Sequence, residues 1–194
     1  MVNKYNGKRY GNGFTNRISN CFSLPEFDKN KISQMQERDD CVISIVNNEE
    51  MFKDALLLDL KEDEETLGVD FCTRRITRRR EVYFGNKNFS SKDNPYSYYY
   101  LNCFIIYHNG EPVGKCDLFM QRGWAKIEDF HVVSDKRRQG YGTTLLKHVL
   151  NVALSKNMHP TIYLVTDEED TAKEMYQKVG FFKVGERMDL LFKW

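Results

Sequence analysis

The stretch from Val132 to Leu154 constrains the fold more than any other part of the chain. An extended, β-branched segment runs into a basic turn that contains two glycines, and apolar residues then recur with helical spacing. This order predicts a strand, a turn and a helix. Gly140 and Gly142 allow a ligand to approach the backbone closely, and the free N–H groups of the first helical turn favour an anion. The turn therefore predicts a diphosphate-binding site.

Composition limits the class of protein. A chain of 194 residues with 41% hydrophobic residues suits one well-packed domain, and a net charge of +1 argues against general attraction to nucleic acid or to an anionic membrane. Five scattered cysteines without a C-x-x-C pair favour a reducing compartment over disulfides or a zinc site. No apolar stretch reaches the roughly 20 residues of a membrane helix, and the N-terminus lacks a signal-peptide core. We expect a cytoplasmic protein with no metal and no membrane partner.

The first half of the chain carries weaker signals. Residues 1–40 are rich in Asn, Lys, Ser and Gly, which predicts a weakly structured or accessory extension before a main domain at 41–194. Residues 41–46 are typical of a strand, and Asn47 or Asn48 can cap the amphipathic helix that follows. Between residues 68 and 95 the periodicity fades.

The second half predicts a mixed α/β fold. Three antiparallel strands lead into the phosphate turn, and an Asn109-Gly110 pair suits a type I′ hairpin between the first two. Helices and strands then alternate, which indicates an α+β mixed sheet with helices on its faces. The expected strands are 98–107, 112–120, 124–133, 161–165, 181–184 and 189–194, and the expected helices are 143–157 and 171–179, with Thr171 and Glu174 as a capping box and Gly180 as the terminator.

Two motifs carry a family resemblance. Arg137-x-x-Gly140-x-Gly142 resembles the Gln/Arg-x-x-Gly-x-Gly/Ala signature of the GCN5-related N-acetyltransferase (GNAT) family, which holds the pyrophosphate of acetyl-coenzyme A in this turn. Downstream, Ala172-x-x-x-Tyr176 and the Gly-Phe pair that follows resemble a second block of the family. The resemblance implies a central, mostly antiparallel twisted sheet with splayed middle strands and helices on both faces. It also implies acetyl-coenzyme A as cosubstrate.

The resemblance further implies which residues bind the coenzyme. Splayed strands leave backbone groups unpaired, and an amide-rich pantetheine arm can satisfy them. A tight loop without a ligand is the alternative for the glycines. The implied contacts are Phe130, His131 and Val132 for the arm, and Arg137, Arg138, Gln139, Gly140, Tyr141, Gly142 and Thr143 for the pyrophosphate.

Three side chains are the main candidates for proton transfer, and a fourth is a conceivable substitute. Helical spacing alone makes Tyr176 a core tyrosine, whereas the resemblance implies that it donates a proton to the departing thiolate, since a phenol has a pKa of about 10 and a thiol about 8.5. Glu128 is the first candidate for the base and Asp129 the second, and strict strand alternation places them on opposite faces. For both carboxylates a purely surface role is the alternative. His131 is a conceivable substitute base.

Two features depart from the family pattern or extend it. Many relatives have an asparagine seven residues before the tyrosine, where this chain has Glu169. A carboxylate cannot donate a hydrogen bond as an amide does, which puts that coenzyme contact in doubt. Five arginines lie within residues 74–80. They form either a solvated surface or a site for an acidic substrate or the 3′-phosphate of the coenzyme.

The resemblance implies acetyl transfer to a primary amine by direct attack in a ternary complex, and a backbone N–H near Val132 is expected to stabilise the oxyanion. The acceptor stays open among small molecules, peptides and proteins, and the protein is expected as a monomer or homodimer. One alternative is a non-catalytic acyl-coenzyme A sensor or interaction module. Another is a nucleic-acid or phosphoprotein interaction protein that uses the arginine run, although the net charge argues against nucleic acid.

Overall fold

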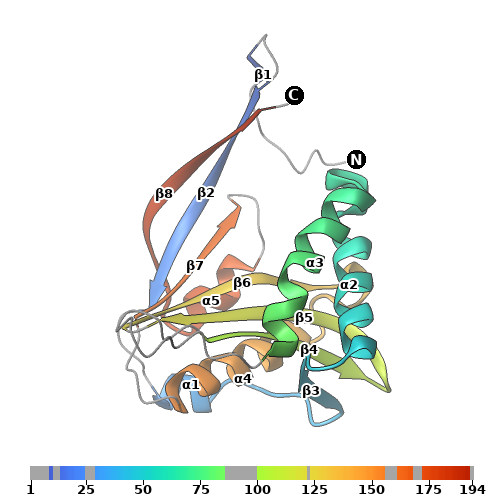
Figure 1. Cartoon of the computed structure of the whole chain (residues 1–194). Coiled ribbons are helices and arrows are strands. Elements are labelled where there is room, and N and C mark those ends of the chain that lie inside the picture. The colour runs from blue at the N-terminus through green and yellow to red at the C-terminus, as the bar shows by residue number, and fades with distance from the viewer. Residues whose placement is uncertain are drawn as a thin grey trace, which may run out of the picture.

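The computed structural model describes residues 9–10, 14–24, 29–85, 100–121, 123–155, 161–167 and 172–192. The strands are β1 (Arg9–Tyr10), β2 (Phe14–Leu24), β3 (Cys41–Ile45), β4 (Tyr100–His108), β5 (Glu111–Gln121), β6 (Trp124–Val132), β7 (Thr161–Asp167) and β8 (Phe182–Phe192). The helices are α1 (Lys29–Ser33), α2 (Glu49–Leu67), α3 (Val69–Gly85), α4 (Tyr141–Ser155) and α5 (Lys173–Lys178), with a 3-10 turn at Ser134–Lys136 (Figure 1).

The eight described strands form one mixed sheet. Its order is β1-β2-β7-β6-β5-β4-β3, and β8 also pairs with β2. Strands β3 to β6 are antiparallel neighbours, whereas β6 and β7 run parallel. Helices α2 and α3 pack on one face and α4 on the other (Figure 1). The predicted α/β class, with a mostly antiparallel sheet and helices on both faces, is confirmed.

The hairpin between β4 and β5 forms as its sequence predicts. Asn109 has a φ of 52° and Gly110 a φ of 81°. A type I′ turn needs positive φ at both central residues, which asparagine and glycine tolerate best. The turn fixes the β4–β5 register and, through it, the position of β6.

The middle strands separate where the site is expected. Strand β6 pairs with β7 only over the first four residues of each, ending at Ile127 opposite Leu164. Beyond that point β7 continues along β2, with Val165 opposite Cys21, while β6 continues along β5. Among the described strands, the backbone of β6 after Ile127 therefore has a neighbour on one side only.

Strand β6 also carries a β-bulge next to this separation. Glu128 pairs with Asp117 and His131 with Lys115, so two residues of β6 lie between the pairs where β5 has only Cys116. Asp129 has a φ of 44°, in the left-handed region. Such an extra residue breaks the alternation of side chains and redirects its neighbours.

Residues 14–24 differ from the loose structure expected for 1–40. Strand β2 lies between β7 on one side and β8 on the other, and β2 and β8 run together away from the rest of the sheet (Figure 1). Phe22 and Leu24 are buried, and so are the polar side chains of Ser19 and Asn20. Backbone pairing on both sides holds this strand despite its polar composition. The division of the chain at residue 40 stays a prediction.

Helix α3 is the second element that the periodicity missed. Cys72, Ile76 and Tyr83 recur at intervals of four and seven residues and are buried, but arginines between them mask this stripe. Helix α2 begins as predicted, because the Asn48 side-chain oxygen accepts a 2.9 Å hydrogen bond from the Met51 N–H.

The other element boundaries differ in detail. Helix α4 begins at Tyr141 rather than at residue 143, and the two closing strands are one strand, β8. Gly180 ends α5 with a φ of 105°. Thr171 of the expected capping box and part of the strand expected from residue 98 lie outside the described residues.

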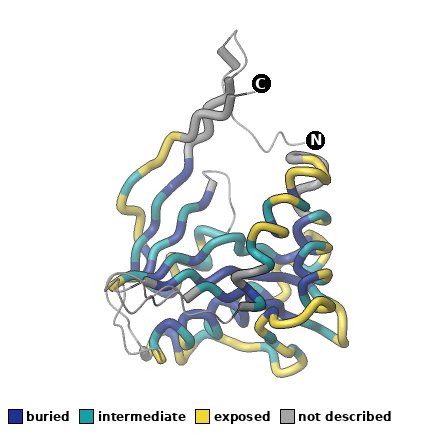
Figure 2. Tube along the Cα trace, viewed as in Figure 1, coloured by how far each residue is buried: buried dark blue, intermediate teal, exposed yellow. Residues whose placement is uncertain are grey.

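The core lies on the sheet beneath α4. Leu145, Leu146, Val149, Leu150 and Ala153 recur with helical spacing and are fully buried against β4, β5 and β6. Figure 2 shows the buried tube concentrated in the central strands and in this helix. None of the helices in the described part of the chain is long and apolar enough to cross a membrane.

Gly114 tests how tightly β5 and β6 are packed. A Cβ at this position would lie 2.8 Å from the His131 carbonyl oxygen and 3.1 Å from Val132 Cγ2. Because the first contact is with backbone, the strands would have to move apart. We expect Gly114→Ala to lower the free energy of unfolding by about 1–3 kcal/mol in urea denaturation. Gly185→Ala in β8 is the control, because a Cβ there meets nothing within 4 Å; equal stability of the two variants would contradict this packing.

Candidate active site

The loop before α4 is exposed and turns twice through the left-handed region. Arg138 has a φ of 61° and Gly140 a φ of 90°. Residues 137–140 are all exposed, and the loop ends where α4 begins. A helix of 15 residues directs its first free N–H groups and the positive end of its dipole toward this loop. The geometry is that of an anion site.

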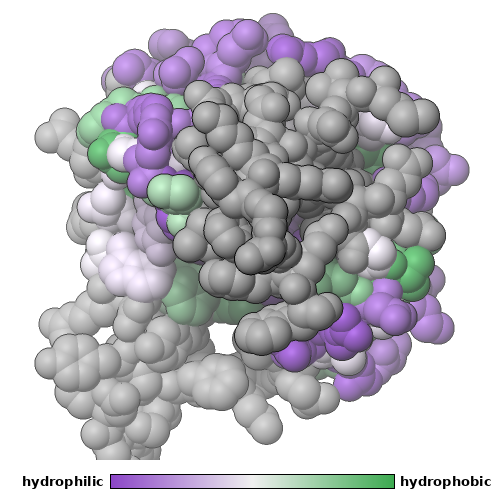
Figure 3. All heavy atoms as spheres, turned by 90° about the horizontal axis from the view of Figure 1, so that it is seen from above, coloured by the Kyte–Doolittle hydropathy of each residue, from purple (hydrophilic) through white to green (hydrophobic). Residues whose placement is uncertain are grey.

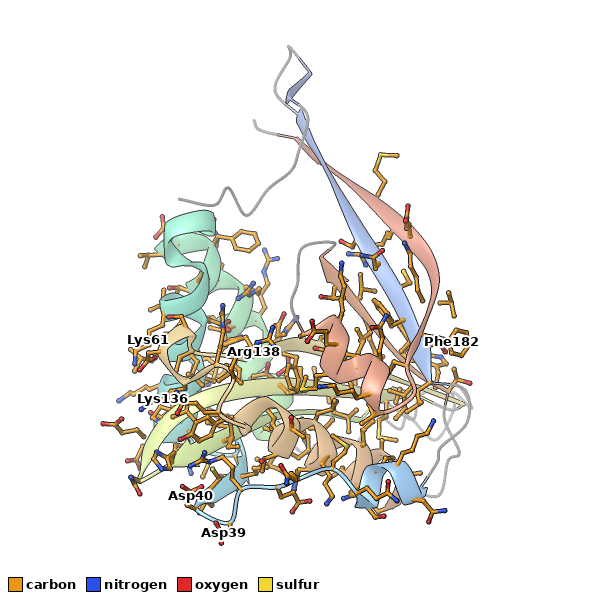
Figure 4. The ribbon with its side chains drawn as sticks, turned by 180° about the vertical axis from the view of Figure 1, so that it is seen from behind. Asp39, Asp40, Lys61, Lys136, Arg138 and Phe182 are labelled. Atoms are coloured by element: carbon orange, nitrogen blue, oxygen red, sulfur yellow. The ribbon has the colours of Figure 1, made fainter. Side chains whose placement is uncertain are left out.

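Two of the predicted side chains hold the loop together. Arg137 Nε donates a 2.8 Å hydrogen bond to the Val132 carbonyl oxygen, and Gln139 Nε2 donates one of 2.9 Å to the Asp135 carbonyl oxygen. The Arg138 side chain extends from the loop toward α5, where its Nη1 lies 3.4 Å from the Glu174 carboxylate. Figure 4 labels Arg138 above the sheet, and Asp39 and Asp40 lower down, near β3.

Tyr141 has a different role from the other predicted contacts. Its side chain is buried, and its ring lies 5.5 Å from the ring of His108 and 4.4 Å from Arg38 Cζ. The ring therefore faces the core, and the residue can contact a ligand only through its backbone. Thr143, in the same turn, is half-buried, and the Thr144 N–H already donates to the Gly140 carbonyl oxygen.

Arg38, which the sequence did not suggest, lies behind this loop. Its Nη1 donates a 2.8 Å hydrogen bond to the Gln139 carbonyl oxygen, and its backbone N–H donates one of 3.0 Å to Thr144 Oγ1. The guanidinium also pairs with Asp40. Nearby, Lys147 on α4 donates to the carbonyl oxygen of Met35. The segment before β3 is thus attached to the start of α4.

Gly142 faces a gap between the loop helix, β6 and α5. A Cβ there would lie 3.5 Å from Met175 Sδ, 3.7 Å from Phe130 Cε1 and 3.7 Å from Val132 Cγ2. These are ordinary contact distances, so Gly142 lies directly against residues of β6 and α5. The gap is the side of β6 beyond Ile127 from which β7 has separated.

The backbone of β6 offers hydrogen bonds toward the same gap. The Val133 N–H donates to the Val113 carbonyl oxygen of β5 at 3.0 Å. Because hydrogen-bonding directions alternate along a strand, the Val132 N–H is directed away from β5, toward the open side. The Val132 carbonyl oxygen accepts from Arg137, so the N–H is the group of this residue that a ligand can use.

Tyr176 lies on the gap side of β6. Its side chain is buried, with its ring centroid 6.0 Å from that of Phe130 and 5.9 Å from that of Phe181, both edge to face. The two sequence motifs are therefore brought together at Phe130. Burial fits the core interpretation of Tyr176, and its contact with Phe130 places it beside the gap.

The two candidate bases lie on the α3 side of β6. The alternation that would separate Glu128 from Asp129 fails at the bulge, because Arg79 contacts both carboxylates, Asp129 through Nη1 and Glu128 through Nη2 at 3.7 Å. Glu128 also forms an ion pair with Lys126 on its own strand. The expectation of opposite faces is therefore wrong, and the extra residue at 129 is the reason.

Asp129 is the poorer base of the two. Burial of its carboxyl opposes ionisation, but Lys115 and Arg79 outweigh it and hold the pKa of Asp129 below its usual value. Its side chain is 22% exposed against 31% for Glu128. A buried carboxylate with such partners keeps its negative charge and accepts protons weakly. His131, the conceivable substitute, is half-buried and paired with Lys115 across the strands.

The arginine run divides into two groups. Arg75, Arg79 and Arg80 form ion pairs with protein carboxylates, Arg75 with Asp59 and Arg80 with Glu49, whereas Arg74 and Arg78 are exposed. Arg79 is therefore the arginine of the run that reaches the candidate bases, and its guanidinium is paired with carboxylates of the protein. Figure 3 shows mainly hydrophilic side chains along the described rim of the upper face. Glu169 lies outside the described residues.

The fold thus places separated central strands beside a glycine loop and the start of a helix. Residues 71–181 match the family model described as acetyltransferase (GNAT) family. The chain belongs to that family, which confirms the resemblance. No group of three or more His, Cys, Asp or Glu that could hold a metal ion occurs among the residues described above.

Relatives extend the comparison. The chain is 36% identical over 94 residues to the uncharacterized N-acetyltransferase CgeE of Bacillus subtilis, a match over 47% of this chain and 36% of that protein. It is similar to a functionally unknown conserved protein from Staphylococcus epidermidis, with a TM-score of 0.69 and 20% identity over 93% of this chain and 63% of that one. AAC(6')-Iy, solved with a coenzyme A bisubstrate analogue, has a TM-score of 0.57 and 15% identity, covering 79% of this chain and 97% of that one. The chain thus spans about a third of the curated relative.

Gly142 provides a direct test of the gap. We expect Gly142→Val to abolish the binding of coenzyme A in calorimetry, because its two methyl groups would occupy the space beside Phe130 and Met175. Gly142→Ala is the matched control, since a single Cβ makes only ordinary contacts. Unchanged affinity in the valine variant would mean that the ligand does not pass here.

Arg38 tests whether the segment behind the loop supports it. We expect Arg38→Ala to weaken coenzyme A binding by about tenfold in calorimetry, because a charged hydrogen bond to the loop contributes on the order of 1.5–3 kcal/mol. Asp39→Ala, at an exposed neighbouring residue, serves as the control. Equal affinity in both variants and the wild type would show that the loop is stable without Arg38.

Proposed function

We propose that the protein is an acetyl-coenzyme A-dependent N-acetyltransferase that transfers the acetyl group to a primary amine by direct attack in a ternary complex. The observation that carries the proposal is the separation of β6 from β7 after Ile127, next to Gly142 and the start of α4. The thioester supplies the acyl group. Family membership and the relatives named N-acetyltransferase support the same chemistry.

The coenzyme would bind along residues that the loop and β6 present. The backbone of Phe130, His131 and Val132 would hold the pantetheine arm, with the Val132 N–H turned toward it. The pyrophosphate would bind at residues 137–143, where Arg137 and Gln139 shape the loop, Arg138 adds exposed charge, and Tyr141 contributes only its N–H. A fixed N–H near Val132 would also stabilise negative charge that develops on the acyl oxygen.

The candidate proton-transfer groups lie on two sides of β6. Glu128 reaches the α3 side, whereas Tyr176 packs on Phe130 beside α4 and α5. An amine that enters from the α3 side would meet Glu128 as its base, and the departing thiolate would meet Tyr176 as its acid. A primary amine with a pKa near about 10 is mostly ammonium at neutral pH, so a base is needed before attack.

A non-catalytic acyl-coenzyme A module is the second candidate. The observation that favours it is the pairing of Glu128 with both Lys126 and Arg79, which reduces its availability as a base. Thiol release with acetyl-coenzyme A separates the two functions across a panel of a polyamine, an aminoglycoside-type amine, an amino acid, a peptide N-terminus and a peptide lysine. Saturable coenzyme binding without release on any amine favours the module.

The acceptor, the cytoplasmic location and the monomeric or homodimeric state stay predictions. For an acceptor that supports turnover, initial rates over both substrates test the ternary complex. Intersecting double-reciprocal lines are expected for direct attack, and parallel lines would indicate an acetylated enzyme instead.

Tyr176 has a kinetic test of its own. We expect Tyr176→Phe to lower kcat by about 10²-fold with little change in coenzyme affinity, because the phenol would be lost while the packing against Phe130 and Phe181 is kept. Stopped assays give kcat, and calorimetry gives the affinity. Phe181→Leu, which alters the same cluster without removing a hydroxyl, is the control. A wild-type kcat in Tyr176→Phe would mean that the hydroxyl takes no part in catalysis and that Tyr176 serves only to pack the core.

A further inference from the structure

Arg79 contacts the carboxylates that surround the β6 bulge. From the middle of α3 its Nη1 lies 2.5 Å from Asp117 Oδ2 on β5 and contacts Asp129 Oδ2 on β6, while its Nη2 lies 3.7 Å from Glu128. One guanidinium thus contacts three carboxylates on two strands. Its side chain is 25% exposed, so these contacts are only partly screened by water.

The surroundings make this contact hard to replace. Asp117 is fully buried and accepts a 2.7 Å hydrogen bond from the Tyr83 hydroxyl. Lys115, also fully buried, lies 2.8 Å from Asp59 and 3.9 Å from Asp129. Removal of Arg79 would take away the cation that contacts both Asp117 and Asp129, and would leave Lys115 as the main positive charge beside them. Like charges close together in a buried site repel strongly.

The bulge itself needs such a constraint. An aspartate with a φ of 44° occupies a sparsely populated region, and surrounding contacts must hold it there. Arg79 on α3 contacts both the Asp129 carboxylate on β6 and the Asp117 carboxylate on β5. It therefore links the extra residue of the bulge to α3 and to the neighbouring strand. Phe130, which follows directly, carries the contact with Tyr176, and Val132 carries the N–H that faces the gap.

We propose that Arg79 is a positioning residue of the acyl-transfer site, which holds the β6 bulge in place and thereby orients Glu128 and the backbone of residues 130–132. This inference rests on the proposed acetyl transfer. It also assigns different roles to the two adjacent acids: Asp129 is the anchor of the bulge, and Glu128, farther from the guanidinium and more exposed, is the base.

Arg79→Met removes the charge and the donors but keeps the length of the side chain. We expect kcat with a competent amine to fall by about 10²-fold, the size of effect that a misplaced reacting group produces, while coenzyme affinity stays within a factor of about three. Arg79→Lys restores part of the rate because it returns a single charge. The matched control is Arg80→Met, at the next residue of α3, which contacts Glu49 and Phe84 away from the bulge.

The pH profile separates positioning from general destabilisation. Lys115 and Arg79 hold the pKa of Asp129 below its usual value, so removal of Arg79 lets Asp129 take up a proton at higher pH, and the acid limb of kcat/KM should move to higher pH. Asp129→Asn in the Arg79→Met background should abolish that move. Among the described residues, the other charged or titratable groups around these carboxylates are Lys115, Cys116 and Asp117 from β5, Cys103 from β4, Asp59 from α2, Arg75 and Tyr83 from α3, and Lys126 and His131 from β6.

Amide hydrogen exchange gives a readout that needs no turnover. Arg79→Met should raise exchange over residues 128–132, and Arg80→Met should leave it unchanged. The proposal would be overturned if Arg79→Met kept the wild-type kcat, the wild-type acid limb of kcat/KM and the wild-type amide exchange over residues 128–132. The proposal would also be overturned if Arg79→Met lost coenzyme affinity and thermal stability together while the acid limb of kcat/KM stayed where it is in the wild type. If the wild type releases no thiol with any amine, the proposed acetyl transfer fails, whereas the exchange result still decides whether Arg79 holds the bulge.

Discussion

The structure depends on the way in which β6 uses its backbone hydrogen bonds. On one side the strand pairs with β5 over nearly its whole length, and on the other it pairs with β7 over four residues only. Buried backbone groups need partners, so the one-sided part of β6 is stable in a folded protein only beside water or a ligand with its own amides. The glycine loop, the start of α4 and Tyr176 all lie around this part of the strand.

The chemistry on the two faces of β6 follows from the bulge. Before Asp129 the side chains alternate regularly, and after it the register with β5 has moved by one residue. Glu128 therefore remains on the α3 face with Asp129, while Phe130 faces Gly142 and Tyr176. One extra residue thus gives the same strand a polar face and an apolar face, which the proposed transfer would use for the amine and the thioester.

Local signals in the sequence were sufficient for the loop and for the second half of the sheet. Gly140 and Gly142, and the Asn109-Gly110 pair, act within a few residues, so their conformations can be predicted from composition. The bulge could not, because aspartate has no strong preference for positive φ and its partner Arg79 lies 50 residues earlier. The inward orientation of Tyr141 was also hidden, since it depends on Arg38, a residue of the segment before β3.

Strand β2 has consequences for the time at which the sheet can form. Apart from the two residues of β1, its native partners are β7 and β8, which begin at residues 161 and 182 and so follow it by well over a hundred residues along the chain. On the ribosome, residues 14–24 emerge long before either neighbour exists. The edge of the sheet beside the candidate site is therefore among the last parts to assemble, and closure of so long a loop slows this step. During synthesis the nascent chain therefore carries residues 14–24 without the two strands, β7 and β8, that pair with them in the folded protein.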